Sequence, residues 1–318
     1  PAATARSWVI ATGSSAARPP IPGLDRTPVI TNRELFELDS LPASLIVLGA
    51  GPIGAEMSQA FSRLGTRVTV VDQGHHILPR EDHDLADAVR RVLESEGVDF
   101  KLGCTIEEVR DLGHGREVRV RTADRRELRL TAEAVLVALG RSANTEGLGL
   151  EAIGVTFDRR GIAVDRRMRT SRKHIFAAGD VAGGPQFTHA AGYGGGIVVS
   201  NAVFHLPRKA DFTWLPHCTY TDPPLASIGM NETAAKAAGI AYSLWTEEFQ
   251  ANDRSLAEGE GTGRIKMLLD SSERPIGVQI LGPNAGDLIA EWVAVLNGKV
   301  KLATLAAAVH PYPTIAEI

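Results

Sequence analysis

The sequence predicts an α/β fold with two Rossmann-like nucleotide-binding units and a further α+β domain. Apolar strands alternate with helix-patterned stretches through residues 41–150, which is typical of parallel βαβ units. Two apolar strands that end in glycine, residues 9–13 and 136–140, have the pattern of strands that close a nucleotide-binding sheet. Taken alone, each is more often just a buried strand before a tight turn. Beyond residue 210, strands follow one another across short turns, which favours an antiparallel sheet.

The first two thirds of the chain can be assigned to elements in order. A terminal strand over 8–13 precedes a Pro-rich turn, and strand–helix pairs then follow the hydrophobic periodicity. Alternating charges over 118–131 indicate an antiparallel excursion, after which 134–140 returns as a buried strand. The other predicted elements are strands at 45–48, 68–71 and 175–180 and helices near 57–64, 85–92 and 189–204.

The last third of the chain has a different pattern. Residues 264–269 and 276–281 are apolar strands separated by a turn, which favours an antiparallel pair. Two helices follow, one around Trp292 and one over 302–307. This change predicts a domain boundary near residue 210.

Length and composition exclude several classes of protein. A chain of 318 residues is long enough for roughly two domains. It is 44% apolar, with 34 basic and 38 acidic residues and a net charge of 34 − 38 = −4. These values exclude extended disorder and argue against a nucleic-acid partner, which calls for a basic surface. No apolar run is long enough to cross a bilayer, so no membrane partner is expected.

The two cysteines, Cys104 and Cys218, lie far apart in the sequence. A disulfide framework and a Cys-rich zinc site are therefore excluded, and the pattern suits a reducing cytoplasm. No signal peptide is visible, and because the chain begins with Pro1 we expect its natural start to lie elsewhere. His75, His76 and His83 could suggest a metal site, but no cysteine or acid cluster supports one. Surface-loop histidines are the favoured interpretation, and no metal is expected.

Residues 49–54 match the pattern G-x-G-x-x-G in the context that makes it informative. The motif follows a predicted strand, opens an amphipathic helix and precedes a second strand that ends at Asp72. Gly49 allows the tight turn, Gly51 allows close approach of a pyrophosphate, and Gly54 lets helix and strand pack closely. The helix N-terminus offers N–H groups and partial positive charge to phosphates. A glycine-rich turn that binds nothing is the weaker alternative.

Asp72 also bears on the choice of cofactor. Its carboxylate can accept hydrogen bonds from an adenosine ribose and would repel the 2′-phosphate of NADP. No arginine follows until Arg80. The sequence therefore favours NAD(H) over NADP(H).

Six short motifs, taken in one order, resemble those of the flavin-dependent pyridine nucleotide–disulfide oxidoreductases. The resemblance is strongest to the dihydrolipoamide dehydrogenases and the mercuric reductases, and it runs through nearly the whole chain. No single motif is decisive, whereas their common order is highly specific. The motifs lie at residues 11–13, 49–56, 138–141, 170–180, 221–223 and 313–317.

This resemblance implies a split FAD domain, an inserted NAD(P) domain, and an interface domain through which the enzyme forms homodimers. In this chain, residues 1–40 would be the tail of the first FAD portion and 41–145 the NAD(P)-binding domain. Residues 146–210 would be the second FAD portion, and 211–318 the interface domain. The C-terminal motif would complete the active site of the partner subunit.

The resemblance also implies roles for single residues. Asp180 would bond the ribitol of FAD, and Thr188 and His189 would open a helix aimed at the flavin, whose positive end stabilises the reduced ring. Glu56 would lie beside the nicotinamide. Without the family, Asp180 is equally a loop or cap aspartate, and Glu56 is merely an acid on a helix face. The remaining implied cofactor contacts are Thr12, Gly13, Gly140 and Gly179.

Two departures from the family pattern bear on function. The N-terminal FAD glycine motif and the C-x-x-x-x-C redox pair are absent, and the chain stops just after Glu317, where the family continues. Cys104 and Cys218 do not have the spacing of that pair and are interpreted as packed thiols. We therefore expect the sequence to be a fragment that holds a nicotinamide cofactor but not FAD by itself.

The second departure is Tyr312, which occupies the position of the catalytic histidine of lipoamide-type enzymes. A phenol with a pKa of about 10 is a poor base at neutral pH, although it can donate a hydrogen bond. Mercuric-reductase-like members also place tyrosine here, which favours that branch. Tyr312, Glu317 and Glu56 are the candidate catalytic residues. A local shift that lets His310 substitute, or a purely structural Pro-rich turn, are the alternatives.

Two functions from different classes fit these residues. In the first, an FAD-dependent oxidoreductase passes electrons from NADH through the flavin to a disulfide, a metal ion or another small acceptor. In the second, a flavin-free module binds NADH and dimerises through residues 211–318. A weaker third function is electron transfer within a complex by a degenerate flavoprotein.

Overall fold

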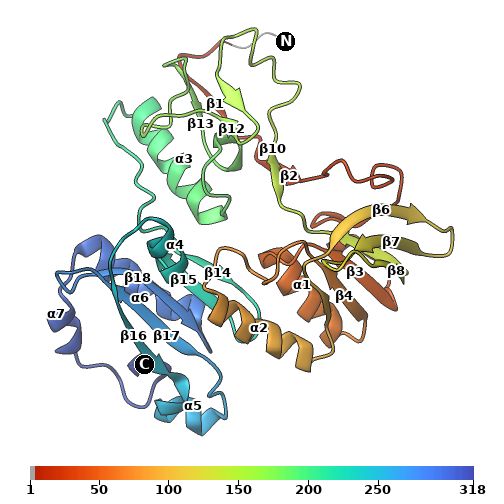
Figure 1. The fold of residues 1–318 in the computed structure, drawn as a ribbon. Helices are drawn as coiled ribbons and strands as arrows, with labels where there is room; N and C mark the ends of the chain where they lie inside the picture. Colours follow the sequence, from red (N-terminus) through yellow and green to blue (C-terminus); the bar gives the residue numbers. More distant parts are fainter. Residues whose placement is uncertain (1–3) are drawn as a thin grey trace. The chain divides into compact units, whose positions relative to one another are not determined.

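The computed structural model of the chain describes residues 4–318. They form two compact units, and each unit is built from two stretches of chain (Figure 1). The first unit combines the residues up to Ala17 with Gly140–Thr213, and the second combines Arg18–Leu139 with Trp214–Ile318. The predicted domains are defined by the cofactor that each would bind, whereas the two units are defined by how compactly the chain packs. The predicted bounds are 1–40, 41–145, 146–210 and 211–318. That division therefore stays a prediction.

In the first unit, the terminal strand pairs with a strand far along the chain. Strand β1 lies parallel to β13, with Val9 opposite Phe176. Helix α3 covers this pair, because Phe176 and Ala178 pack against Ile197 and Val198. The elements of this unit are β1 (Trp8–Ile10), β2 (Ser14–Ala16), β10 (Arg141–Ala143), β11 (Phe157–Asp158), β12 (Gly161–Ile162), β13 (Ile175–Ala177), η2 (Asp180–Ala182) and α3 (Thr188–Ala202).

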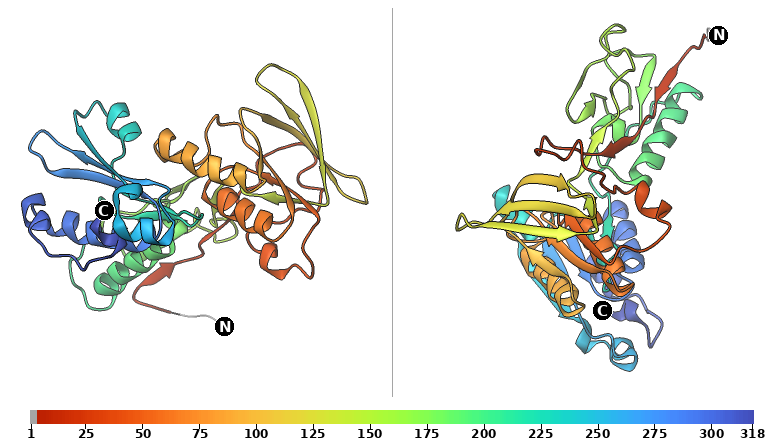
Figure 2. Two further views of the ribbon diagram at one scale, coloured as in Figure 1. Left: turned by 90° about the horizontal axis from the view of Figure 1, so that it is seen from below. Right: turned by 90° about the vertical axis from the view of Figure 1, so that its right-hand side faces the viewer.

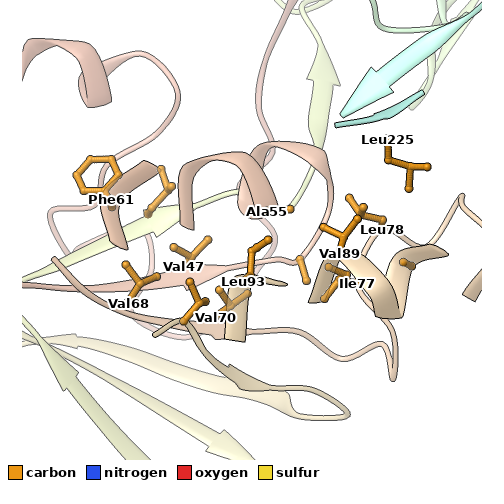
Figure 3. Close-up of a cluster of buried hydrophobic side chains, with 14 of the residues drawn as sticks. Val47, Ala55, Phe61, Val68, Val70, Ile77, Leu78, Val89, Leu93 and Leu225 are labelled. Carbon is orange, nitrogen blue, oxygen red and sulfur yellow. The ribbon is translucent and has the colours of Figure 1, made fainter. Parts of the chain in front are cut away.

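The second unit begins with the predicted parallel sheet, whose strand order is β5-β4-β3-β9. All five residues of β3 are buried, as expected for a strand covered on both faces. Val47, Val68 and Val70 pack with Phe61 and Leu93 of the two helices (Figure 3). These elements are η1 (Glu34–Glu37), β3 (Ser44–Leu48), α1 (Pro52–Arg63), β4 (Arg67–Val71), α2 (His83–Ser95), β5 (Asp99–Lys101) and β9 (Ala134–Val137).

A three-stranded antiparallel sheet forms a separate layer on the parallel sheet (Figure 2). Its side chains Val109, Val118 and Val120 pack with Ile46 and Leu48 of β3. The predicted excursion at 118–131 is confirmed as β7 and β8, and β6 adds a strand that the sequence pattern did not reveal. The strands are β6 (Thr105–Asp111), β7 (Arg116–Arg121) and β8 (Glu127–Ala132).

The rest of the second unit is a five-stranded antiparallel sheet of order β14-β15-β18-β17-β16. The predicted pair of strands is present as β17 and β18, and α6 packs its buried Ile289 and Leu296 on the sheet. The α/β class with a closing α+β domain is thus confirmed. The elements are β14 (His217–Thr219), β15 (Leu225–Gly229), α4 (Glu232–Ala237), β16 (Ser243–Glu248), η3 (Phe249–Ala251), α5 (Asp253–Glu258), β17 (Arg264–Leu269), β18 (Pro275–Leu281), α6 (Ala285–Gly298), α7 (Leu302–Ala306) and η4 (Ile315–Glu317).

Two consecutive buried acids in the segment between β4 and α2 contact the antiparallel sheet. Glu81, only 4% exposed, lies 2.7 Å from His217 Nε2 through Oε1. Its Oε2 accepts hydrogen bonds from Ser227 Oγ at 2.6 Å and from Gln279 Nε2 at 2.7 Å. A buried carboxylate is stable only when it is paired and hydrogen-bonded, and Glu81 meets both conditions. It therefore ties three strands of the sheet, β14, β15 and β18, to one loop.

The second acid, Asp82, shares the buried ammonium of Lys266 with two other carboxylates. Lys266 Nζ, 1% exposed, lies 2.9 Å from Asp82, 2.9 Å from Asp84 and 2.8 Å from Glu232. Burial disfavours the charged Lys266, yet hydrogen bonds to the three acids raise its pKa above the ordinary value. Asp82 also accepts the backbone N–H of Thr233 at 2.9 Å and so stabilises the first turn of α4. The cluster fixes β17 and α4 against the start of α2.

We expect the Glu232→Gln variant to lose about 2 kcal/mol of stability at neutral pH. Hydrogen bonds from Lys266 and Tyr242 lower the pKa of Glu232 to about 2, against about 4.3 in an unfolded chain. A carboxyl group with a depressed pKa stabilises the fold fully above its unfolded pKa and loses that effect as the pH falls through its folded pKa. The difference between wild type and variant should therefore shrink between about pH 5 and pH 2.

Urea unfolding at several pH values measures this difference. The matched control is Glu258→Gln, which removes an exposed i,i+4 partner of Arg254 and should cost less than about 0.5 kcal/mol. A pH-independent difference between wild type and Glu232→Gln would contradict this account of the cluster.

Candidate functional site

The glycine loop after β3 is shaped by close backbone contacts. Gly49 has φ +104°, and a Cβ atom on it would lie 2.4 Å from the Ala138 carbonyl oxygen. A Cβ atom on Gly54 would lie 1.9 Å from the Gly49 carbonyl oxygen. Side chains at either position would collide with backbone, which cannot move aside. These two glycines therefore permit the tight turn and the close packing of α1 on the sheet, in line with the sequence argument.

Gly51 is different, because a Cβ atom there would meet nothing within 4 Å. It is the N-cap residue of α1, and Pro52 occupies the first helical position. The N–H groups of a first helical turn have no intrahelical acceptor and carry partial positive charge. Open space in front of such a helix end suits the phosphates of a dinucleotide.

Asp72 lies beside this loop, as the motif spacing predicts. Its Oδ2 accepts the Ala50 N–H at 2.7 Å, and its Oδ1 accepts the Gly74 N–H at 2.6 Å. A carboxylate has about four lone-pair positions, so two of them are left for ribose hydroxyl groups. Asp72 therefore both fixes the loop and presents an acceptor at the end of β4.

Glu56 lies one turn along α1 and contacts the segment after β14. Its Oε1 accepts the Tyr220 N–H at 2.8 Å, and burial raises the pKa of Glu56 despite that bond. Nearby, burial and the negative charges of Glu56, Glu81 and Asp287 raise the pKa of Cys218 to about 12. Burial also raises the pKa of Cys104. Both cysteines are free and stay protonated near neutral pH, which fits packed thiols.

The first unit holds a second group of predicted residues. Asp180 follows β13, and its carboxylate accepts a hydrogen bond from Ser14 Oγ and lies 3.5 Å from Arg141 Nε. Arg141 in turn donates to Ser14 Oγ at 2.6 Å and to the Ser14 carbonyl oxygen at 2.8 Å. These contacts orient the Asp180 carboxylate at the end of the strand.

The predicted glycines of this unit border the same strand ends. Thr12 and Gly13 are joined to Asn144, which donates Nδ2 to the Thr12 carbonyl at 2.8 Å and its backbone N–H to the Gly13 carbonyl at 2.9 Å. Gly13 and Gly140 have positive φ, and a Cβ atom on either would meet nothing within 4 Å. Gly179, with φ +75°, directly precedes Asp180.

Thr188 and His189 are the first residues of α3, as predicted. The N-cap residue is Phe187, whose side chain has no oxygen to accept hydrogen bonds from the first turn. The rings of Phe187 and His189 stack with centroids 5.3 Å apart. Such a helix end attracts negative charge.

The C-terminal run lines a cavity of about 540 Å³ in the second unit. Tyr312 donates its hydroxyl hydrogen to Asp253 Oδ2 at 3.0 Å, and this bond raises the pKa of Tyr312. Glu317 also lines the cavity, but it forms a capping box with Thr314. The phenol is therefore paired with an acid that the sequence did not single out, and Glu317 is used in the local turn.

His310 has its own partner in this region. Its Nε2 lies 3.0 Å from Glu291 Oε1 on α6, and the hydrogen bond raises the pKa of His310. This contact does not test the alternative in which His310 takes over the role of the catalytic histidine of the family. Neither His310 nor Glu291 lines the cavity that Tyr312 lines.

The histidines near β4 are packed against each other. The rings of His76 and His83 stack with centroids 3.9 Å apart, and His76 Nδ1 lies 3.1 Å from Asp87. Within residues 4–318, no three His, Cys, Asp or Glu side chains are placed to hold a metal ion. None of the helices described over that range is long and apolar enough to cross a membrane.

Sequence reasoning missed residues whose importance depends on distant contacts. Arg141 belongs to one of the predicted motifs, but the motif does not reveal its contacts with Ser14 and Asp180. Asp253 lies 59 positions before Tyr312 and has no motif of its own. Glu81 and Asp82 open a helix after Pro79 and Arg80, which is the usual pattern of solvent-exposed acids. None of these residues has a local sequence pattern that points to its distant partner.

Comparison with protein families gives two matches that together cover nearly the whole chain. The model described as pyridine nucleotide-disulphide oxidoreductase matches residues 2–195. The model of the dimerisation domain of the same family matches residues 215–318.

Curated relatives are identical to this chain at about a third of the aligned positions. A mercuric reductase from Staphylococcus aureus is 34% identical over 316 residues, which is 99% of this chain and 58% of that protein. A dihydrolipoamide dehydrogenase from Chaetomium thermophilum is 36% identical, over 99% of this chain and 63% of that protein. The chain thus spans less than two thirds of the length of these relatives.

Two solved structures of similar fold have comparable sequence identity to this chain. The HOCl-induced flavoprotein disulfide reductase RclA from Escherichia coli, as its Cu(II) complex, superimposes with a TM-score of 0.89 at 30% identity. The alignment covers 98% of this chain and 72% of that one. LpdA from Mycobacterium tuberculosis gives a TM-score of 0.87 at 29% identity, covering 97% and 67% respectively.

The two types of glycine in the loop predict opposite effects of substitution. Gly54→Ala should destabilise the second unit by about 2 kcal/mol or more, because its Cβ atom would overlap the Gly49 carbonyl. Gly51→Ala should leave stability unchanged and weaken dinucleotide binding, because its methyl group would occupy the open space before α1. Thermal unfolding and fluorescence titration with NADH measure both effects. Equal losses of stability in the two variants would contradict the assignment.

Proposed function

Because the chain belongs to the pyridine nucleotide–disulphide oxidoreductase family, we propose that it supports FAD-dependent electron transfer from NADH to an acceptor. The acceptor would be a disulfide, a metal ion or another small molecule. The observation that supports the proposal is that each unit contains a group of polar residues and glycines of the kind that can bind a cofactor. The glycine loop with Asp72 lies in one unit, and Asp180 with its supporting residues lies in the other.

The residues of the second unit fit a nicotinamide dinucleotide. The open end of α1 at Gly51 would take the pyrophosphate, and the free lone pairs of Asp72 would accept the ribose hydroxyl groups. The negative charge of Asp72 favours NADH over NADPH. Glu56 would face the nicotinamide, held in place by the Tyr220 N–H.

The residues of the first unit fit the sugar and ring of a flavin. Asp180 would accept hydroxyl hydrogens of the ribityl chain, with Ser14 and Arg141 fixing its orientation. Thr12, Gly13, Gly140 and Gly179 border this position, and Thr188 and His189 at the start of α3 would face the ring with a positive helix end. When bound, the nicotinamide supplies a hydride and the flavin relays electron pairs.

The acceptor side is proposed from the C-terminal run. Because the hydrogen bond to Asp253 raises the pKa of Tyr312, the phenol stays protonated near neutral pH and would act as a donor, not as a base. This favours a metal ion or another acceptor that needs no histidine base. The match to a dimerisation domain supports a homodimer, and the two free thiols support a reducing, cytoplasmic location.

A flavin-free module that binds NADH is the second candidate. The intact loop at 49–54 would bind NADH equally well in such a module. A flavin-free module, however, would have no role for the oriented carboxylate of Asp180. The relatives named above as mercuric reductase and dihydrolipoamide dehydrogenase favour the flavoprotein.

The deciding experiment is anaerobic mixing of NADH with the protein purified at its full natural length and loaded with FAD. We expect bleaching of the flavin absorbance, followed by its return when Hg(II) or lipoamide is added as acceptor. An Asp180→Ala variant should retain NADH binding and lose FAD. Binding of NADH together with no detectable binding of FAD would favour the flavin-free module.

The cofactor preference rests on Asp72, and Asp72→Asn tests it. We expect the KM for NADH to rise roughly tenfold or more, because a hydrogen bond to a charged acceptor is lost. The KM for NADPH should change little or fall, because the repulsion of its 2′-phosphate is removed. Steady-state kinetics with both cofactors measure this. An equal loss for both would show that Asp72 acts only by fixing the loop through the Ala50 N–H.

A further inference from the structure

A cavity in the first unit is lined by an unusual set of charged residues. It measures about 380 Å³ and lies where Ser7 precedes β1 and His174 precedes β13. This is the end of the two parallel strands opposite to Asp180, so the cavity is separate from the proposed flavin site. Five residues that can carry positive charge line it, and none of the lining residues is acidic: Arg167, Arg169, Lys173, His174 and His205.

Two of these cations have no acidic partner. Arg169 is neutralised by Asp165, with Nη2 lying 2.7 Å from Oδ2. Among residues 4–318, no carboxylate lies within 4 Å of the Arg167 guanidinium or the Lys173 ammonium. The cavity therefore concentrates about two uncompensated positive charges in a chain whose net charge is −4. Unpaired like charges in a concave site repel one another and attract a counter-ion.

Hydrogen bonds connect the two walls of the cavity. One wall is the tight turn before β13, in which Arg169 pairs with Phe176. The other wall is formed by residues at the end of α3 and in the loop after it. Asn201 ties the two together, since Nδ2 donates to the Arg167 carbonyl at 3.1 Å and to the Arg208 carbonyl at 2.9 Å. Its Oδ1 accepts the Arg208 N–H at 2.9 Å.

A further pair of bonds closes the same junction. The Ala210 N–H donates to the Arg166 carbonyl at 2.6 Å, and Arg166 Nε donates to the Ala210 carbonyl at 3.2 Å. The position of the Arg167 backbone is thus determined from both sides. A preorganised site loses little entropy when it binds a ligand.

We propose that this cavity binds a small organic phosphate. Two uncompensated cations match a phosphate dianion, whereas a carboxylate carries a single charge. The imidazoles of His174 and His205 add donors at the rim. Phe176, Leu206 and Pro207 supply an apolar surface for the ligand's body, and a volume of about 380 Å³ lies in the range of small-ligand pockets. The proposal is independent of the proposed oxidoreductase function.

The test is calorimetric titration of the protein with phenyl phosphate, with FAD and NAD⁺ both present at saturating concentration. Under these conditions the phosphate positions of both cofactor sites are filled. We expect one saturable site, a roughly tenfold loss of affinity in Arg167→Gln and in Lys173→Gln, and a larger loss in the double variant. Arg167→Lys, which keeps the charge, should retain most of the affinity.

The matched control is Arg159→Gln, which removes one positive charge from the exposed turn between β11 and β12 in the same unit. It should leave binding unchanged, and thermal unfolding of each variant shows whether the fold is intact. Benzoate and inorganic phosphate separate the contributions of the dianion and of the ring. The proposal is overturned if binding does not saturate, if benzoate binds as well as phenyl phosphate, or if the folded double variant binds like wild type.

Discussion

The second unit depends on the burial of two consecutive carboxylates at the start of α2. Glu81 reaches three strands of the antiparallel sheet through His217, Ser227 and Gln279. Asp82 meets Lys266 on a fourth strand and the first turn of α4. Burying acids is costly unless every oxygen has a partner, and these contacts supply the partners. Leu225 and Leu281 share the hydrophobic core of the parallel sheet. The polar junction and this shared core together hold the two sheets against each other.

That junction also reaches the proposed nicotinamide position. His217 belongs to β14, and the segment directly after this strand presents the Tyr220 N–H to Glu56. The Gln59 side chain holds the same segment, accepting the Asp222 N–H and donating to the Asp222 carbonyl, both at 2.8 Å. Glu81 and Glu56 are therefore connected through β14 and the segment that follows it. The orientation of a residue on α1 depends on a sheet that is more than 150 positions away in the sequence.

The elements of the fold with strong local patterns were predictable from the sequence. The strand at 45–48, the glycine loop and Asp72 were assigned together because their spacing has a physical reason. Strand β16 could not be assigned, since all six of its residues are exposed and show no alternation of burial. Among the site residues, Gly51 and Asp72 lie where the motif places them. Asp253 and Arg141 act through partners 59 and 127 positions away, and local patterns contain no information about such pairs. The roles of Tyr312 and Glu317 remain predictions for the same reason.

The pairing of β1 with β13 has a consequence for the order in which the chain folds. The paired residues of the two strands are 167 positions apart, and the whole of β3 to β9 lies between them. A ribosome must therefore release the chain through Thr213 before the first unit can close. The parallel sheet between them can form earlier, but its buried acids find their partners only when β14 to β18 emerge. Contacts of such long sequence separation slow folding, and they leave apolar strands exposed until their partner strands have been synthesised. The chain crosses between the two units three times, and a cut at any of these crossings would divide at least one unit between two fragments.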